Sequence, residues 1–378
     1  MTHPETFDVA VIGAGIAGAS LAYRLVAQRS VVLLERESQP GYHSTGRSAA
    51  MFMESYGPPA VRALTRASRS FYMRPPVGFT EHALLGTRGA MYLARPDQQD
   101  LLAQEHAVLA ASCPELEQLD HEQTLARVAC LRPERVHGSL LDHGAMDIDV
   151  AALHQGFIRG LRRHGGVLRT SAEVTGASWH KPLWELRLSG GGTLRARVVV
   201  NAAGAWADQI GALCGAQTIG LVPHRRTAFT FKPPEGMPVA HWPVVSSVDE
   251  SFYFKPDAGV LLGSPANADP TLPHDVVPEE LDVATGIHHI EAATTLSIRR
   301  PLRTWAGLRS FVPDGEMVIG WDAQCDNFFW LAGQGGYGIQ SAPGASELAA
   351  SLVLGLPLPE KLARHGVDPD ALSPRRLP

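Results

Sequence analysis

The sequence predicts an α/β protein with an α+β insert: a Rossmann-like nucleotide-binding domain and a second domain built on a mixed or antiparallel sheet. Two glycine-rich turns, one near each end of the chain, predict the first domain. One follows the apolar run at 8–12 and leads into a helix-forming stretch at 19–27, and the other joins the apolar run at 328–332 to a helix of small residues. Strand-like alternation between them, as at 227–231, predicts the insert.

The first turn, GAGIAG at 13–18, has the spacing of a dinucleotide-binding fingerprint. In such a turn Gly13 permits the tight bend, Gly15 lets a pyrophosphate approach the backbone, and Gly18 lets the helix pack closely on the strand. The phosphates would lie at the N-terminus of the helix, where unpaired N–H groups favour an anion. The next strand ends on Glu35, whose carboxylate would accept hydrogen bonds from an adenosine ribose and repel the 2′-phosphate of NADP.

The uncharged stretch at 9–23 has two alternative interpretations, a buried glycine-rich helix and a membrane span. It is shorter than the ~20 residues that a span needs, and three glycines interrupt it. We therefore predict a nucleotide site and no transmembrane segment.

Composition excludes several other classes. With 378 residues, 45% of them hydrophobic and 19% charged, the chain is globular and long enough for two domains. A net charge of -5 gives no reason to expect a nucleic-acid partner. Four cysteines without a C-x-x-C pair, and His288-His289 without companion ligands, predict no metal site and no disulfide framework. Residues 1–7 lack the basic and apolar regions of a signal peptide, so we expect a cytoplasmic protein, with weak membrane association left open.

The chain is expected to form two discontinuous domains. The nucleotide-binding domain takes residues 1–50, 141–220 and 301–378, and the substrate domain takes 51–140 and 221–300.

Both ends of the nucleotide-binding domain are expected to face one extended cofactor. The apolar strand at 198–200 ends in small residues, which suits a buried parallel strand beside a cofactor. The second turn, GQGGYG at 333–338, again precedes a helix whose N-terminus could hold a partial negative charge. A second glycine-rich turn that faces the cofactor favours FAD over NAD, because a nicotinamide enzyme would not need a second turn.

Several longer runs are more specific than the glycine fingerprint. They are ERE at 35–37 with QPGYHSTGRSAA at 39–50, VNAAGAW at 200–206, DESFY at 249–253, GSPANADP at 263–270, TWAGLRSF at 304–311 and QGGYGIQ at 334–340. With them the whole chain resembles the FAD-dependent D-amino-acid oxidase and dehydrogenase superfamily, and within it the bacterial D-arginine dehydrogenases.

The resemblance implies a two-domain fold that holds FAD non-covalently. Some relatives bind the flavin through a cysteine, but the residues around Cys325 do not match that motif. The positions that it assigns to the cofactor are Gly13, Gly15, Ile16, Ala17, Gly18, Glu35, Arg36, Ser44, Thr45, Arg47, Ser48, Ala49, Val174, Ala203, Gly204, Trp206, Gly335, Gly336, Tyr337, Gly338 and Ile339.

The reaction that the resemblance implies is oxidation of a D-amino acid. A hydride passes from Cα to the flavin, and the imino acid then hydrolyses to a 2-oxo acid and ammonia. Position matching assigns the substrate carboxylate to Arg226 and Arg309, since a guanidinium pairs bidentately with a carboxylate. Tyr56 and Tyr253 would add hydroxyl contacts and a lid, and the Gly336 carbonyl would accept from the amine. We name no general base, because a substrate bound with a neutral amine needs none.

Each assignment has a structural alternative. Arg226 could form a solvated pair with Arg225, because adjacent arginines are common on surfaces. Tyr253 could belong to the core, and Tyr56 could anchor a loop. His43 could act as a base, but we expect a packed loop residue.

The side-chain pocket departs from the D-arginine dehydrogenases. Met51 and Ala90 stand where those enzymes would carry a histidine and a glutamate. Met53 replaces a small polar residue, and Ser246 is assigned to the same pocket. Removing the partner of a desolvated cation costs about 3–5 kcal/mol, so we expect apolar or aromatic D-amino acids to be preferred over D-arginine. The alternative is that Glu54 replaces the missing glutamate.

Two other functions stay open. One is oxidation of a secondary or cyclic amine, such as sarcosine, D-proline or a natural-product intermediate. The other, of a different class, is a flavin-bound assembly or interaction protein without turnover. The electron acceptor, O2 or a quinone-like molecule, is left open too, as is the oligomeric state.

Overall fold

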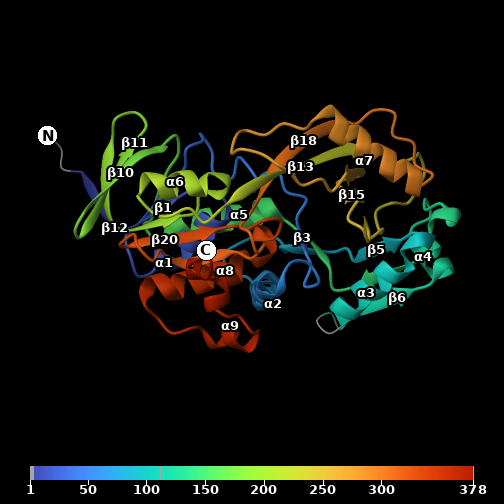
Figure 1. Ribbon diagram of the computed structural model, residues 1–378, viewed down its shortest axis with the longest axis horizontal. Coiled ribbons are helices and arrows are strands. Elements are labelled where there is room, and N and C mark those ends of the chain that lie inside the picture. The colour runs from blue at the N-terminus through green and yellow to red at the C-terminus, as the bar shows by residue number, and fades with distance from the viewer. Residues whose placement is uncertain (1–3, 111–112, 114, 378) are drawn as a thin grey trace.

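The computed structural model describes residues 4–110, 113 and 115–377, which form two lobes lying side by side along the long axis (Figure 1). A largely parallel sheet forms the first lobe. Across it lie β10 (Val174–His180), β11 (Leu183–Leu188), β12 (Thr193–Asn201), β1 (Glu5–Ile12), β2 (Val31–Leu34) and β9 (Val167–Arg169), with β20 (Phe328–Ala332) beside β12 and β19 (Val318–Trp321) beside β20. The pairs β10–β11, β11–β12 and β19–β20 are antiparallel, and the other neighbours pair parallel.

Helices cover both faces of this sheet. Along β1, Val9 and Val11 face one apolar cluster, and Ala10 and Ile12 face another. The first cluster is completed by α1 (Ile16–Leu25), α2 (Pro59–Met73), α5 (Val150–Arg163), α8 (Gly338–Leu354) and α9 (Glu360–Arg364), and the second by α6 (Ala207–Leu213). The side chain of Asp149 accepts from the backbone N–H of Ala152 at 2.8 Å and begins α5, as an N-cap does.

The second lobe is built on a mixed sheet, as predicted. In order, its strands are β17 (Asp269–Pro270), β13 (Val222–Phe231), β16 (Val260–Ser264), β15 (Tyr253–Asp257), β14 (Val244–Ser247), β5 (Ala90–Ala94), β7 (Gly138–Asp142) and β6 (Leu116–Leu119), with β18 (Arg303–Phe311) also on β13. Only the β14–β5 pair among these described strands is parallel. The helices of this lobe are α3 (Gln99–Ala110), α4 (His121–Arg127) and α7 (Glu280–Ala293).

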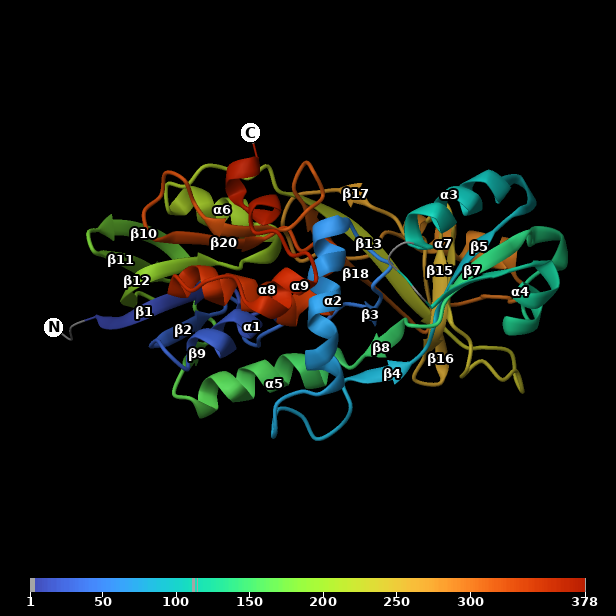
Figure 2. The same cartoon turned by 90° about the horizontal axis from the view of Figure 1, so that it is seen from below.

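A small sheet lies where the two lobes meet (Figure 2). It consists of β3 (Met51–Phe52), β8 (Met146–Ile148) and β4 (Leu85–Thr87). No helix in the described residues is long and apolar enough to cross a membrane.

Two elements lie across the predicted domain division. Strand β18, expected in the nucleotide-binding part 301–378, pairs with β13 of the second sheet at nine successive positions. Helix α2, expected in the substrate part 51–140, buries Val61, Leu64 and Ala67 in the core of the first lobe. The domain to which a strand or helix belongs is set by the strand it pairs with and by the core in which its apolar face is buried. Neither can be read from the order of the elements along the chain.

Candidate active site

A cavity of about 300 Å³ lies between the two lobes. All of the residues predicted for catalysis and for the side-chain pocket line it: Arg226, Arg309, Tyr253, Tyr56, Gly336, Met51, Met53, Ala90 and Ser246. A second cavity of about 180 Å³, lined by Glu35, Val174 and Trp206, lies near the ends of β1 and β2. The two cavities share the lining residues Gly15, Ser44, Thr45, Ala202, Gly204 and Ala205, so they adjoin, and we refer to both together as the slot.

The first glycine turn forms the wall where the two cavities meet. Gly13 has φ +102°, and a Cβ there would overlap the carbonyl oxygen of Ala202. A Cβ on Gly18 would overlap the carbonyl oxygen of Gly13 and stand 3.2 Å from the side chain of Val11. Gly18 therefore allows the helix to pack on the strand, as the fingerprint predicts, and lines neither cavity.

Glu35 holds this turn from the second strand. Its carboxylate accepts from the backbone N–H of Ala14 at 2.9 Å and of Glu37 at 3.0 Å. The backbone N–H of Ile16 donates to the Thr45 hydroxyl at 3.0 Å. A carboxylate has about four lone-pair directions, so Glu35 retains capacity for a ribose hydroxyl, and that contact stays a prediction.

Most of the predicted cofactor residues line the slot. Around the larger cavity are Gly15, Ile16, Ala17, Ser44, Thr45, Arg47, Ser48, Ala49, Gly204, Gly335, Gly336, Gly338 and Ile339, and around the smaller one Gly13, Glu35, Arg36, Val174, Ala203 and Trp206. Tyr337 lines neither cavity and packs edge-on against Tyr56, with ring centroids 5.0 Å apart. Arg36 lies over the Trp206 ring at 4.9 Å.

Arg47 joins the cofactor loop to the second lobe. Its guanidinium donates to the carbonyl oxygens of Val276 at 2.9 Å and Ala306 at 3.2 Å, and it forms an ion pair with Asp275. The loop at 43–48 is therefore fixed from both lobes.

Arg226 and Arg309 lie on the same face of adjacent strands. Arg226 of β13 pairs with Gly307 of β18, and Arg309 is two residues further along. In an antiparallel sheet such diagonal neighbours point to the same side. Arg225 points to the other side and forms ion pairs with Asp282 at 2.9 Å and with Glu279. The solvated-pair alternative thus describes Arg225, and Arg226 faces the cavity.

Neither cavity arginine forms an ion pair with a carboxylate in the described part of the chain. Arg226 Nε donates to the carbonyl oxygen of Asn267 at 2.5 Å, and Arg309 Nη1 donates to the Tyr56 hydroxyl at 3.1 Å. Burial, and then the neighbouring charge of Arg309, lower the pKa of Arg226. Two desolvated cations side by side form a site for an anion with two acceptor oxygens.

The side-chain pocket is lined by apolar residues and by one lysine. Met51, Met53 and Ala90 cluster with Ala145, Val244 and Tyr253. Lys255, which lines the same cavity, lies 2.6 Å from Asp147 and 4.0 Å from the sulfur of Met51.

Asp147 is shared by two cations, because Arg88 also lies 2.7 Å from it. Glu54, the proposed replacement for the missing glutamate, pairs instead with Arg69 at 2.8 Å and does not line the cavity. The pocket wall around Lys255 therefore carries excess positive charge.

Two carboxylates that were not predicted as site residues also line the cavity, on Glu105 of α3 and on Glu250. Glu250 is exposed and Glu105 is half-buried. Burial, and then the charge of Glu250, raise the pKa of Glu105.

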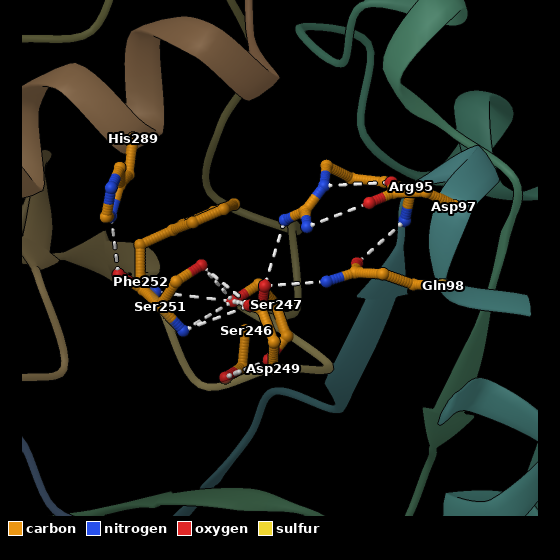
Figure 3. A network of polar contacts seen from close by, with 9 residues as sticks. All are labelled: Arg95, Asp97, Gln98, Ser246, Ser247, Asp249, Ser251, Phe252 and His289. Carbon is orange, nitrogen blue, oxygen red and sulfur yellow. Dashed lines mark hydrogen bonds and ion pairs between the residues drawn. The ribbon is translucent and has the colours of Figure 1, made fainter. Parts of the chain in front are cut away.

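Asp249 fixes the turn that carries Glu250 (Figure 3). Its carboxylate accepts from the hydroxyls of Ser247 at 2.6 Å and Ser251 at 2.7 Å, from Arg95 at 2.9 Å and from Gln98 at 2.6 Å. Burial acts to raise the pKa of Asp249, but these donors outweigh it, and the pKa is lowered. The turn between β14 and β15 is thus a fixed part of the cavity wall.

Three further predictions concern histidine and cysteine. His43 lies 3.0 Å from Glu37, packs on Trp206 and lines the smaller cavity but not the one with Arg226 and Arg309, as expected of a packed loop residue. The described residues contain no cluster of His, Cys, Asp and Glu that could hold a metal. Cys325 donates to the carbonyl of Cys214 at 3.2 Å and lines neither cavity, so its placement gives no support to a covalent flavin link.

A family model described as FAD dependent oxidoreductase matches residues 8–352. The chain belongs to this family. The chain is 25% identical to a glycine oxidase of Bacillus licheniformis, over 94% of this chain and 95% of that protein. It is 24% identical to the mitochondrial dimethylglycine dehydrogenase of Rattus norvegicus, over 92% of this chain and 43% of that protein. Our chain thus spans about two fifths of that dehydrogenase.

Among solved structures, an L-proline dehydrogenase from P. horikoshii superposes with a TM-score of 0.85 at 20% identity, over 99% of this chain and 98% of that one. This similarity confirms the predicted fold class. The comparisons support the superfamily, and the closer resemblance to D-arginine dehydrogenases stays a prediction.

FAD is the cofactor of this FAD dependent oxidoreductase, and the slot fits it. The slot is long and is bounded by glycine turns from both ends of the chain. A Cβ on Gly335 would overlap the ring of Phe311, so this position of the second turn, like Gly13 and Gly18 of the first, has no room for a side chain. The arginines and the apolar pocket stand at the end of the slot that is remote from Glu35.

Proposed function

We propose that this chain oxidises the Cα–N bond of a D-amino acid, giving an imino acid that water hydrolyses to a 2-oxo acid and ammonia. The observation that carries the proposal is the pair of cavity-facing guanidinium groups, Arg226 and Arg309, that have no carboxylate partner among the described residues. They stand at one end of the FAD slot. A substrate carboxylate would neutralise them and place its Cα in the same cavity.

The other cavity residues have roles that follow from this placement. Tyr56 is already hydrogen-bonded to Arg309 and would orient the carboxylate from one side, with Tyr253 on the other. The carbonyl of Gly336 would accept from the substrate amine. When bound, FAD supplies the acceptor for the hydride that leaves Cα. The protein's part is to hold the carboxylate, orient Cα–H and accept a neutral amine.

The pocket supports a preference for apolar or aromatic side chains over D-arginine. Ala90 offers no carboxylate to a guanidinium, and the wall around Lys255 would repel one. Met51 and Met53 provide flexible apolar volume. Glu105 and Glu250, which also line the cavity, are the groups that would have to bind a cationic side chain if D-arginine were preferred.

An anaerobic reduction screen tests the proposal. Purified holoenzyme is mixed with D-leucine, D-methionine, D-phenylalanine, D-arginine and their L-enantiomers, and flavin bleaching is followed. We expect the apolar D-amino acids to reduce the flavin with a kcat/KM at least about 10-fold above that of D-arginine, equivalent to about 1.4 kcal/mol. A preference for D-arginine would contradict the pocket assignment, and reduction by the L-enantiomers alone would contradict the stereochemistry.

The same screen includes the second candidate function, oxidation of a secondary or cyclic amine. The names of two similar proteins, dimethylglycine dehydrogenase and L-proline dehydrogenase, favour testing it. Sarcosine, dimethylglycine and D-proline are therefore added. If none of these amines bleaches the flavin, the chain is a flavin-bound protein without this chemistry. Admitting air after reduction shows whether O2 is the acceptor.

A further inference from the structure

Asp282, in the first turn of α7, is hydrogen-bonded to the strand behind the cavity. One of its oxygens, Oδ2, accepts from Arg225 Nε at 2.9 Å and from the Thr227 hydroxyl at 2.7 Å. The same oxygen accepts from the side-chain amide of Asn267 at 3.1 Å. The Asp282 side chain is only 11% exposed. Its place in the first helical turn adds a favourable interaction with the helix dipole.

These partners surround Arg226 on the far side from the cavity. Arg225 and Thr227 are its two neighbours in β13. Asn267 accepts from the backbone N–H of Thr227 at 2.9 Å with its side chain, and its carbonyl oxygen accepts from Arg226 Nε at 2.5 Å. Asp282 therefore holds both neighbours of Arg226 and also the residue that its guanidinium contacts.

The position of Arg226 must be fixed by its neighbours for an electrostatic reason. It lies beside the guanidinium of Arg309 without a carboxylate partner in the described residues, so the two positive charges repel each other. A long side chain under repulsion will leave its binding geometry unless its base and its Nε are fixed. Asp282 does not line the cavity, so it acts on the substrate only through Arg226.

We propose that Asp282 is a positioning residue that aims Arg226 at the substrate carboxylate. The inference rests on the proposed function, because it needs Arg226 to bind a carboxylate. It assigns to the acidic first turn of α7, which is outside the cavity, a role in substrate affinity.

The experiment compares Asp282→Ala with Asp282→Asn and with a matched control, Glu279→Gln. Glu279 also pairs with Arg225, but its side chain is 58% exposed and its bond is at the outer edge of the network. Binding of benzoate, a carboxylate without an amine, is measured by the perturbation of the flavin spectrum. Reduction by the best amino acid is then followed to separate KM from the limiting rate.

For Asp282→Ala we expect a Kd for benzoate and a KM that are each raised about 10-fold or more, with the limiting reduction rate lowered by less than about 3-fold. Asp282→Asn keeps an acceptor oxygen and should recover part of the affinity. Glu279→Gln should stay within about 2-fold of the parent. If Asp282 had only a structural role, its loss would lower the FAD content and the limiting rate together, and would not raise Kd and KM selectively.

Unchanged benzoate affinity in both Asp282 variants would overturn the inference. If the alanine variant does not fold, the asparagine variant decides: its recovery should be only partial, because a neutral amide is a weaker acceptor for Arg225 than a carboxylate, and benzoate binding at parental strength would overturn the inference. A parent enzyme that binds benzoate but is reduced by no amine would defeat the proposed function alone. A parent that binds no carboxylate would overturn the role of Arg226, and this inference with it.

Discussion

Gly336→Ala is the sharpest test of where the substrate carboxylate binds. Gly336 precedes α8, and its φ lies outside the left-handed region, so alanine fits the backbone. A Cβ there would stand 2.9 Å from Nη1 and 3.1 Å from Cζ of Arg309. To reach ordinary contact at 3.4 Å, the guanidinium must retreat by about 0.5 Å. The substitution therefore moves one binding group and leaves the Gly336 carbonyl in the chain.

The size of the effect follows from that displacement. A misplacement of about 1 Å can cost about 100-fold in rate, so half of it should lower kcat/KM by about 10-fold, or about 1.4 kcal/mol. The cost to folding should be smaller, because the atom that yields is at the end of a flexible side chain. Anaerobic stopped-flow reduction over a range of substrate concentrations measures the effect, and thermal unfolding and FAD content are measured beside it.

The matched control is Gly86→Ala in β4, where a Cβ meets nothing within 4 Å. It should leave kcat/KM and Tm as in the parent. If Gly336→Ala also keeps the parental kcat/KM, Arg309 does not bind the substrate as proposed. If both variants lose FAD, the effect is on folding and not on the carboxylate site.

Two further predictions concern the FAD slot. His154 Nε2 lies 2.9 Å from the Ala14 carbonyl, and burial lowers the pKa of His154 below its unfolded value of about 6.5. Below that pH the unfolded chain therefore binds more protons than the folded one. The free energy of unfolding should be full above about pH 6.5 and fall as the pH drops below it. His154→Gln should flatten this dependence in Tm measured from pH 5 to 8, and an unchanged slope would contradict it. Arg47→Met should speed FAD release by about 10-fold, because two hydrogen bonds to carbonyl groups are lost. Asp275→Asn should have a smaller effect, since Asp275 is 56% exposed, and equal release rates measured by FAD fluorescence would show that Arg47 does not secure the loop.

The parts of the fold that the sequence predicts are those set by local pattern. The strand at 8–12, the glycine turn and the second strand ending on Glu35 are found in the structure as β1, the start of α1 and β2. Helix α2 was missed, although Pro59 at its first turn and the apolar positions of its buried face were a readable signal. The pairing of β13 with β18 could not be read, because it joins segments that are far apart in the chain.

Some residues of the candidate site could be predicted from the sequence, and others could not. The resemblance placed both arginines, both tyrosines and Gly336, and the structure brings all of them to one cavity. Gln340 was missed; it lines the cavity and donates to the Tyr56 carbonyl at 3.1 Å. Lys255 was missed as well, although it is two residues after Tyr253 in β15 and so shares its face of the strand. Glu105 gave no sequence signal, since single acidic residues are usually solvated, and Glu250 was not singled out within the DESFY run at 249–253.

Strand register is what links this fold to its chemistry. In β13 the neighbours Arg225 and Arg226 point to opposite faces, one to the acidic residues near α7 and the other to the cavity. Opposite Arg226 stands Gly307, and Arg309, two residues further along β18, lies diagonally on the same face. A slip of one residue between β13 and β18 would turn Arg309 away from the cavity and break the cationic pair. The carboxylate site therefore depends on the nine paired positions of these strands as much as on the two arginines themselves.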